Sequence, residues 1–178
     1  MKSFKQLIKE SYSYSSLQVR IPFDVSQRIF RVADEIPDNI LAPDGREKRP
    51  HITIKYGILS SDPDVIKNIP LPKKITATLG KTTLFKNEHK DVLIIKVKSP
   101  DLVKLNTLVK KHIECIDTYP VYEPHATIAY LKPGTGERYN NTSSFDGITL
   151  EFTELEFSPK GNNIYISIPL EGNTNETI

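Results

Sequence analysis

Hydrophobic positions along the chain follow two different periods, and together these periods predict strands interleaved with helices. A period of two, or a short β-branched run, marks the strands expected over 17–21, 74–85, 92–98, 148–157 and 164–170. Helical spacing predicts the two main helices, one with Val25, Ile29, Val32 and Ala33 after Pro22, and one with Leu102, Leu105, Leu108, Val109 and Ile113 after Ser99. Helices between antiparallel strands in both halves predict an α+β fold rather than a doubly wound parallel sheet.

Capping and turn residues set the expected element ends. Asp24 or Ser26 is expected to cap the first helix, and Ser99-Pro100-Asp101 the second. Asp62-Pro63-Asp64 predicts a further short helix that ends before Pro70. Strands 74–85 and 92–98 are expected to pair through a turn at 86–91, and strands 148–157 and 164–170 through a turn at 159–163.

Connecting segments complete the domain prediction. Segments 38–49 and 132–147 are polar, read as loops, and are the natural lids for a substrate site. Met1–Glu10 has helical spacing and is followed by a Ser/Tyr stretch over 11–16 that reads as a linker or adaptable arm, so we expect an N-terminal arm over 1–15. One domain is expected over 16–170, with a disordered tail over 171–178.

A seven-residue phrase occurs twice in the chain. Pro50-His51-Ile52-Thr53-Ile54-Lys55-Tyr56 recurs 74 residues later as Pro124-His125-Ala126-Thr127-Ile128-Ala129-Tyr130, with five of the seven positions identical. An internal repeat usually means two structurally equivalent units. The other histidines, His89 and His112, lie outside the phrase and are interpreted as bystanders.

Each phrase reads as a strand whose start is marked by its proline, because proline has no N–H to give to a sheet ladder and is tolerated at the first strand residue. Each histidine is therefore expected near the start of its strand. Residues two apart in a strand share a face, so His51 and Thr53 project together, as do His125 and Thr127. The same alternation places Lys55 beside Thr53, as a candidate phosphate contact. It places Tyr56 and Tyr130 on the opposite, core face.

Two facing histidines suit phosphodiester cleavage. Imidazole has a pKa near 6.5, so one ring can accept a proton while the other donates one. A threonine hydroxyl beside each ring can hold a phosphate oxygen. Because no metal ligand cluster accompanies His51 and His125, the scheme predicts no metal and no cofactor.

The paired His51-Ile52-Thr53 and His125-Ala126-Thr127 motifs resemble the His-x-Thr/Ser signatures of the 2H phosphoesterase superfamily. That family includes RNA 2′,3′-cyclic phosphodiesterases, 2′-5′ RNA ligase-like proteins, 2′-5′ oligoadenylate phosphodiesterases and phage anti-CBASS nucleases. The resemblance implies a bilobal fold of two antiparallel sheets with pseudo-two-fold symmetry and a central cleft. It also implies that His51, Thr53, His125 and Thr127 are the catalytic residues.

Composition limits the class of ligand and the cellular location that we expect for the protein. The chain has 178 residues, is 38% hydrophobic and carries a formal net charge of +2, which favours a small nucleotide or short oligonucleotide over long duplex nucleic acid. A single cysteine, Cys115, excludes an internal disulfide and a Cys-based zinc site. No apolar run has the length of a signal peptide or a membrane span, so we expect a cytoplasmic protein, interpreted as a monomer.

Further contacts stay open on sequence alone. Arg46, Lys48, Arg49 and Lys132 flank the motifs and are candidate phosphate contacts or simply solvated charges. Base stacking could use Tyr12, Tyr14, Tyr122 or Tyr139.

The leading functional hypothesis is a metal-independent phosphodiesterase. Met1–Glu10 resembles the N-terminal segment of many proteins of large tailed phages, which favours an immune-evasion enzyme that hydrolyses cyclic di- or oligonucleotide signals. The alternatives are an RNA 2′,3′-cyclic or 2′-5′ phosphodiesterase, a non-catalytic nucleotide-binding sponge, and a metallohydrolase, which chelator-sensitive activity would reveal.

Overall fold

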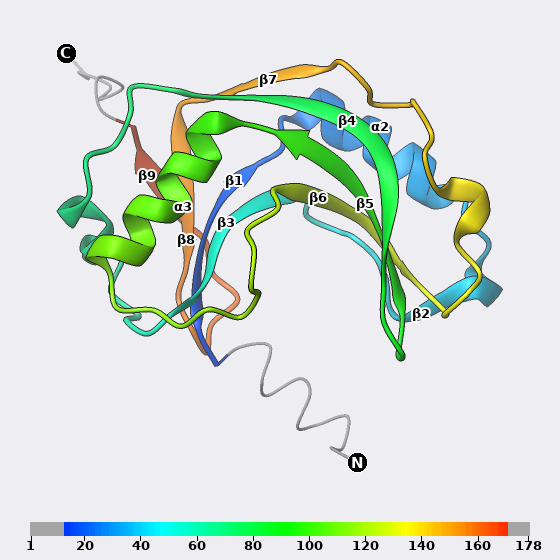
Figure 1. Cartoon of the computed structure of the whole chain (residues 1–178), viewed down its shortest axis with the longest axis horizontal. Helices are drawn as coiled ribbons and strands as arrows, with labels where there is room; N and C mark the ends of the chain where they lie inside the picture. The colour runs from blue at the N-terminus through cyan, green and yellow to red at the C-terminus, as the bar shows by residue number, and fades with distance from the viewer. Residues whose placement is uncertain (1–12, 171–178) are drawn as a thin grey trace.

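The structure, a computed structural model, describes residues 13–170. Their strands form one antiparallel sheet in the order β7-β4-β5-β6-β3-β1-β8-β9, and β2 pairs with β6. The strands are β1 (Ser15–Arg20), β2 (Leu41–Arg46), β3 (His51–Ile58), β4 (Ile75–Lys86), β5 (Asp91–Lys98), β6 (His125–Leu131), β7 (Thr149–Phe152), β8 (Glu154–Ser158) and β9 (Ile166–Pro169). The helices are α2 (Phe23–Asp34) and α3 (Pro100–His112), with short 3-10 helices η1 (Asp38–Ile40), η2 (Pro63–Asn68) and η3 (Glu137–Tyr139). The α+β, antiparallel prediction is confirmed, and the sheet curls into an arch (Figure 1).

The two halves of the sheet repeat one unit. The unit is strand, helix and histidine strand, present once as β1-α2-β3 and again as β5-α3-β6. The two histidine strands are neighbours at the centre, joined by the pairing of Ile52 with Ala126. Helix α2 contacts β6 and α3 contacts β3, so each helix packs against the histidine strand of the other half. The predicted pseudo-two-fold arrangement is therefore present, with its two sheets fused into one across β3 and β6.

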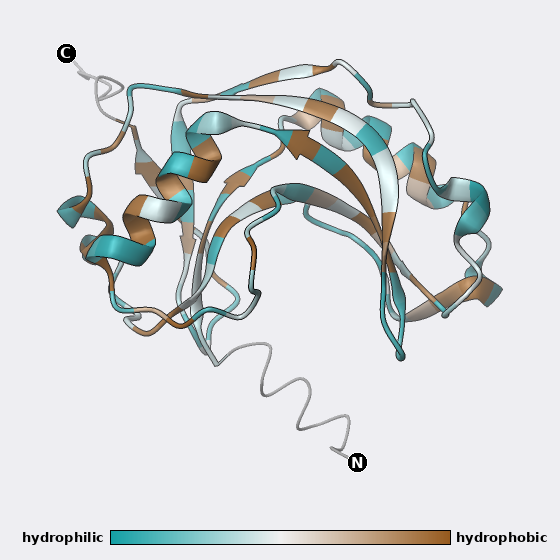
Figure 2. Ribbon diagram, in the orientation of Figure 1, coloured by the Kyte–Doolittle hydropathy of each residue, from teal (hydrophilic) through white to brown (hydrophobic). Residues whose placement is uncertain are grey.

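Apolar side chains from the helices and strands form one buried core. Hydrophobic and hydrophilic residues alternate along the strands and along α3 (Figure 2). The core residues include Val25, Ile29 and Ala33 of α2, Leu102, Leu105 and Val109 of α3, and Ile52, Ile54, Ala126 and Ile128 of the histidine strands. Burying each large aliphatic side chain contributes about 1.5–3 kcal/mol before entropy is counted. The histidine strands are thus fixed from one side by packed core.

Helix starts agree only partly with the predicted caps. Ser99 Oγ accepts from the Leu102 N–H at 3.1 Å, and Asp62 Oδ1 accepts from the Asp64 N–H at 2.9 Å, as expected. Helix α2 instead begins after Pro22 with no side-chain cap, because the hydroxyl of Ser26 donates to the Ile21 carbonyl oxygen at 3.0 Å. Neither described helix is both long and apolar enough to cross a membrane.

The predicted hairpin is confirmed between β8 and β9, but segment 148–157 is not the single strand that was expected as its first partner. It contains β7, which pairs with β4 at one edge of the sheet, and β8, which pairs with β1 and β9 in the other half. Buried Phe152 and Leu155 are three residues apart, which interrupts the period of two at Thr153. The chain therefore crosses between halves at the one place where the alternation fails.

The two predicted loops contain more structure than expected. Segment 38–49 holds η1 and β2, in which Leu41 pairs with Leu131 and Arg46 with Ala129. Pro43 and Gly45 conceal this strand from a propensity argument. Segment 132–147 is tied to β4 by backbone hydrogen bonds from Asn141 and Gly147. Lid closure by either segment stays a prediction.

Candidate active site

The four repeated side chains lie together on one face at the centre of the sheet. The histidines were predicted near the starts of their strands, and His51 and His125 are the first residues of β3 and β6. Because the strands are antiparallel and Ile52 pairs with Ala126, His51 lies across from Thr127 and Thr53 lies across from His125. The two histidines thus occupy one diagonal of a four-cornered site and the two threonines the other. All four residues are only partly buried, so a ligand can reach them.

Both imidazoles are held by the same backbone contact. Nδ1 of His51 lies 2.8 Å from the carbonyl oxygen of Arg49, and Nδ1 of His125 lies 2.7 Å from that of Glu123. A carbonyl can only accept, so Nδ1 carries the hydrogen in each ring. In the neutral tautomer Nε2 is then the free acceptor. Each ring therefore presents its basic nitrogen to the site.

Each histidine strand has an irregularity one residue after its threonine. Against β1, Leu17 pairs with Lys55 and Gln18 with Thr53, which leaves Ile54 as an extra residue. Against β5, Leu93 pairs with Ala129 and Ile94 with Thr127, which leaves Ile128 as an extra residue. Such a bulge exchanges the faces of all later residues in the strand. The two bulges occupy equivalent positions in the repeat.

The bulges correct two face assignments. Lys55 pairs with Leu17, a core residue, so the prediction that Lys55 shares the histidine face is wrong. Its ammonium donates to the carbonyl oxygen of Ile116 at 2.7 Å and to Asp117 Oδ1 at 2.9 Å, and the residue is 5% exposed. The predicted phosphate contact depended on Lys55 sharing a face with His51 and Thr53, and that condition is not met. Lys55 instead anchors the segment that follows α3.

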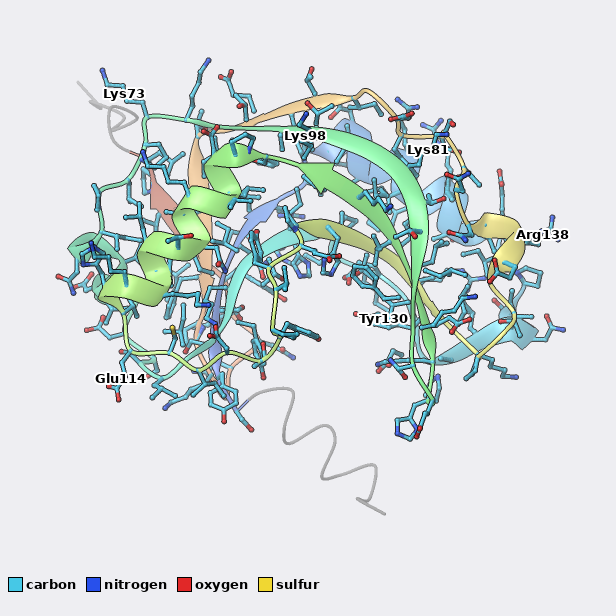
Figure 3. All side chains as sticks on the ribbon, in the orientation of Figure 1. Lys73, Lys81, Lys98, Glu114, Tyr130 and Arg138 are labelled. Carbon is cyan, nitrogen blue, oxygen red and sulfur yellow. The ribbon has the colours of Figure 1, made fainter. Side chains whose placement is uncertain are left out.

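The same bulges bring two tyrosines onto the histidine face, where the core was predicted. Tyr56 pairs with Ser16, whose neighbours Gln18 and Arg20 oppose Thr53 and His51. Tyr130 lies near Thr127, whose hydroxyl partly opposes the shift, and burial raises the pKa of Tyr130 to about 12. Figure 3 shows Tyr130 on the inner side of the right-hand limb of the arch.

His125 has a drier environment than an exposed imidazole. The ring of Phe85 meets it edge to face, with centroids 4.9 Å apart and planes at 80°. Burial lowers the pKa of His125, and the nearby charge of His51 lowers that pKa further. The carbonyl of Glu123 opposes this shift without cancelling it. At neutral pH His125 is therefore mainly a neutral base.

The segment between α3 and β6 passes beside the site. The hydroxyl of Tyr122 donates to the carbonyl oxygen of Thr53 at 2.9 Å, and burial raises the pKa of Tyr122. Tyr119 is 75% exposed, and it raises the pKa of both Tyr56 and Tyr130 electrostatically. Tyr119 therefore lies near both tyrosines of the histidine face. Sequence analysis missed it because nothing in its local pattern distinguishes it from a surface loop residue.

Most of the predicted flanking cations already have protein partners. Arg46 donates to the carbonyl oxygens of Ala33 and Ile36, and Lys132 donates to that of Asn39. Arg49 forms an ion pair with Glu156 at 2.5 Å and lies 3.8 Å from the ring centroid of Tyr165. Lys48 stays exposed, beside a shallow depression lined by Asp44, Arg46, Glu47, Lys90 and Tyr130.

The predicted stacking tyrosines are dispersed. Tyr14 packs edge to face against Tyr56, with ring centroids 5.7 Å apart, so it adjoins the histidine face. Tyr139 lies in η3, and its buried hydroxyl has no hydrogen-bond partner among residues 13–170. Tyr12 lies outside the described residues. Within residues 13–170, no group of three or more His, Cys, Asp or Glu side chains is arranged to hold a metal ion.

Comparison with known proteins identifies the fold. No family model and no curated protein matches the chain. Among solved structures, the Thermus thermophilus protein TT0787 aligns with a TM-score of 0.61 at 14% identity, over 88% of this chain and 96% of its own. Kluyveromyces marxianus Usb1 with uridine monophosphate aligns with a TM-score of 0.55 at 13% identity, over 90% of this chain and 100% of its own. Escherichia coli LigT complexed with 3′-AMP aligns with a TM-score of 0.57 at 14% identity, over 89% of this chain and 95% of its own.

The chain has their fold. Coverage is nearly complete on both sides of each alignment, so the likeness extends over the whole arch and not one half of it. At identities of 12–15% the likeness concerns backbone arrangement.

Proposed function

We propose that this protein is a phosphodiesterase of the 2H type, with His51 and His125 as the general acid–base pair. The observation that carries the proposal is the matched presentation of the two rings. Each Nδ1 is occupied by a carbonyl two residues earlier, and each Nε2 is left for the substrate. A protein that only binds its ligand would not need two histidines that face each other diagonally, each with its hydrogen on Nδ1 and its basic Nε2 toward the ligand.

The proposed reaction moves two protons across one phosphate. The base takes a proton from the attacking oxygen, which is water for a 2′,3′-cyclic phosphate and water or the free vicinal ribose hydroxyl for a linear linkage: the 3′-hydroxyl of a 2′-5′ linkage or the 2′-hydroxyl of a 3′-5′ linkage. The phosphorus–oxygen bond to the leaving group breaks as the new bond forms, and the acid donates its proton to the departing oxygen. Thr53 and Thr127 donate their hydroxyl hydrogens to the non-bridging oxygens and hold the phosphorus between the rings.

We assign the base to His125. Burial and the charge of His51 lower its pKa, which favours the unprotonated ring before the reaction. His51 is then the acid. A substrate bound in the reverse direction would exchange these roles in a fully symmetric site, but the edge contact of Phe85 with His125 supports one direction.

The first candidate substrate is an RNA-type phosphodiester, either a 2′,3′-cyclic phosphate or a 2′-5′ linkage. Structures with this fold have been solved with uridine monophosphate and with 3′-AMP, which supports a nucleotide ligand. Tyr56, Tyr119 and Tyr130 offer aromatic surface near the threonines for a base. Base stacking on an aromatic side chain contributes about 1–3 kcal/mol.

The second candidate is the phage immune-evasion role on cyclic di- or oligonucleotides. It rests on the resemblance of Met1–Glu10, a segment outside the described residues. The same two-histidine chemistry would cleave one phosphodiester of a cyclic oligonucleotide and so make it linear. The two candidates therefore differ in which linkage the protein cleaves.

A turnover panel in EDTA tests the proposal. The panel contains 2′,3′-cyclic nucleotides, 2′-5′ oligoadenylate, and cyclic di- and trinucleotides, with products separated by chromatography. His51→Ala and His125→Ala should each reduce turnover by about 10²–10⁴-fold. His112→Ala is the matched control, because His112 is exposed at the end of α3 and should retain full activity.

The outcomes separate the hypotheses. Cleavage confined to cyclic phosphates or 2′-5′ linkages supports RNA processing, and cleavage of cyclic oligonucleotides supports immune evasion. Activity that requires a divalent metal contradicts the mechanism. Tight binding without turnover of any panel member leaves the nucleotide-binding sponge.

A further inference from the structure

Two exposed cations occupy equivalent positions beside the two histidines. Arg20 of β1 pairs directly with His51, and Lys96 of β5 pairs directly with His125. Directly paired residues on neighbouring antiparallel strands project from the same face. Because β1 and β5 are the equivalent strands of the repeat, the pseudo-two-fold axis relates Arg20 to Lys96 as it relates His51 to His125.

Two rows of residues therefore cross the centre of the sheet. One row runs Arg20, His51, Thr127, Ile94 and the other runs Gln18, Thr53, His125, Lys96. Each row has one cation, next to its histidine, and the cations lie at opposite ends. With neighbouring strands about 4.8 Å apart and a rise of about 3.4 Å per residue, Arg20 and Lys96 are separated by about 14 Å across the strands and about 7 Å along them.

Neither cation is used by the fold. Within residues 13–170, the side chains of Arg20 and Lys96 make no hydrogen bond or ion pair, and both residues are exposed. Arg46, Arg49 and Lys55 behave differently, because each is held by a carbonyl or a carboxylate. On the same face, the buried carboxylate of Glu156 is already occupied by Gln18 and Arg49 and does not neutralise Arg20.

We propose that Arg20 and Lys96 bind phosphate groups on either side of the phosphate held between the histidines. The inference rests on the proposed function for the central phosphate and adds the class of substrate. The preferred ligand is an oligonucleotide, linear or cyclic, with at least one further phosphate on each side of the reacting one. A nucleoside 2′,3′-cyclic phosphate carries a single phosphate and uses neither cation.

The test measures binding rather than turnover. Calorimetry compares the diadenylate ApA with pApAp, which is phosphorylated at both ends. The unaltered protein should bind pApAp more tightly than ApA. Arg20→Gln and Lys96→Gln should each weaken pApAp binding by about tenfold and leave ApA binding unchanged, because each removes one charge-assisted phosphate contact. Lys104→Gln on the exposed side of α3 is the matched control for loss of one positive charge.

Salt dependence gives a second readout. For single strands, the logarithm of the binding constant falls with log salt by about 0.7 per phosphate contact, so each variant should reduce that slope by about 0.7. Unchanged affinity and slope for pApAp in both variants would overturn the proposal. If binding is unchanged in both variants but the unaltered protein cleaves phosphodiesters, only the proposal of flanking phosphate sites is wrong. If both variants lose pApAp binding as expected but the unaltered protein cleaves nothing, the catalytic proposal is wrong and the flanking sites stand.

Discussion

Arg49 and Glu123 occupy the same position in the two repeats, two residues before the histidine, and each accepts the Nδ1 hydrogen of that histidine on its backbone carbonyl oxygen. Their side chains have opposite charges and different surroundings. Arg49 is paired with Glu156, whose side chain is 9% exposed, whereas Glu123 is exposed. The repeat thus preserves a backbone contact while the side chains diverge.

Loss of Arg49 should destabilise the fold far more than loss of Glu123. Arg49→Met leaves the Glu156 carboxylate buried without its cation, and we expect the free energy of unfolding to fall by about 2–4 kcal/mol. Glu123→Gln should change it by less than about 0.5 kcal/mol. Urea unfolding of both variants gives the comparison. Adding Glu156→Gln to Arg49→Met should recover part of the loss, and no recovery would contradict an origin in the buried carboxylate.

Phe85 should control the titration of His125. Phe85→Ala opens one side of the imidazole to water and reduces the burial that lowers its pKa, so the pKa of His125 should rise toward 6.5. Histidine ring resonances followed by NMR against pH measure this directly and without substrate. Phe85→Leu retains apolar cover and should keep most of the shift. A titration that is identical in all three proteins would refute the role of Phe85.

The pH profile of kcat/KM follows from the same shift. A base with a lowered pKa stays deprotonated until the pH falls below that pKa, so the acidic limb of the profile should lie below pH 6.5. In Phe85→Ala the limb should move to higher pH by the amount that NMR measures. A limb at or above 6.5 in the unaltered protein would reverse the assignment of His125 as the base.

Gly57 is the most constrained glycine near the site. Its φ is +98°, and an added Cβ would lie 2.5 Å from the carbonyl oxygen of Ile116. That oxygen also accepts from Lys55, so it cannot move without disturbing the segment beside the site. Gly57→Ala should therefore cost about 2–4 kcal/mol in unfolding free energy. Gly45→Ala, at φ +70° with open space around it, should cost about 1 kcal/mol, and equal losses would show that strain alone accounts for both.

The fold class and the site centre could be predicted from sequence because both depend on short-range pattern. The stripes of α2 and α3 and the Pro-His-x-Thr phrase are visible without long-range information. Strand β2 was missed because its pairing with β6 compensates for Pro43 and Gly45, which are poor strand formers. The crossing at Thr153 was missed although the three-residue spacing from Phe152 to Leu155 signalled it.

The errors at the site have a single physical cause. The face assignments assume that side chains alternate strictly along each histidine strand, but Ile54 and Ile128 are extra residues that interrupt this alternation. One bulge in each strand moved Lys55 to the core face and brought Tyr56 and Tyr130 to the histidine face. A single sequence gives no reliable sign of a bulge in a β-branched run, so partner strands were needed to locate it.

The two halves of the arch are joined on both sides of the histidines, and this has a mechanical consequence. Next to His51 and His125, β3 and β6 share the Ile52–Ala126 pair, and further along β6 the strand β2 adds the Leu41–Leu131 and Arg46–Ala129 pairs. Helices α2 and α3 each pack against the histidine strand of the other half. A rotation of one half against the other would have to break several of these contacts at once. The spacing of the two imidazoles is therefore set by the framework of the protein and not by the ligand that binds between them.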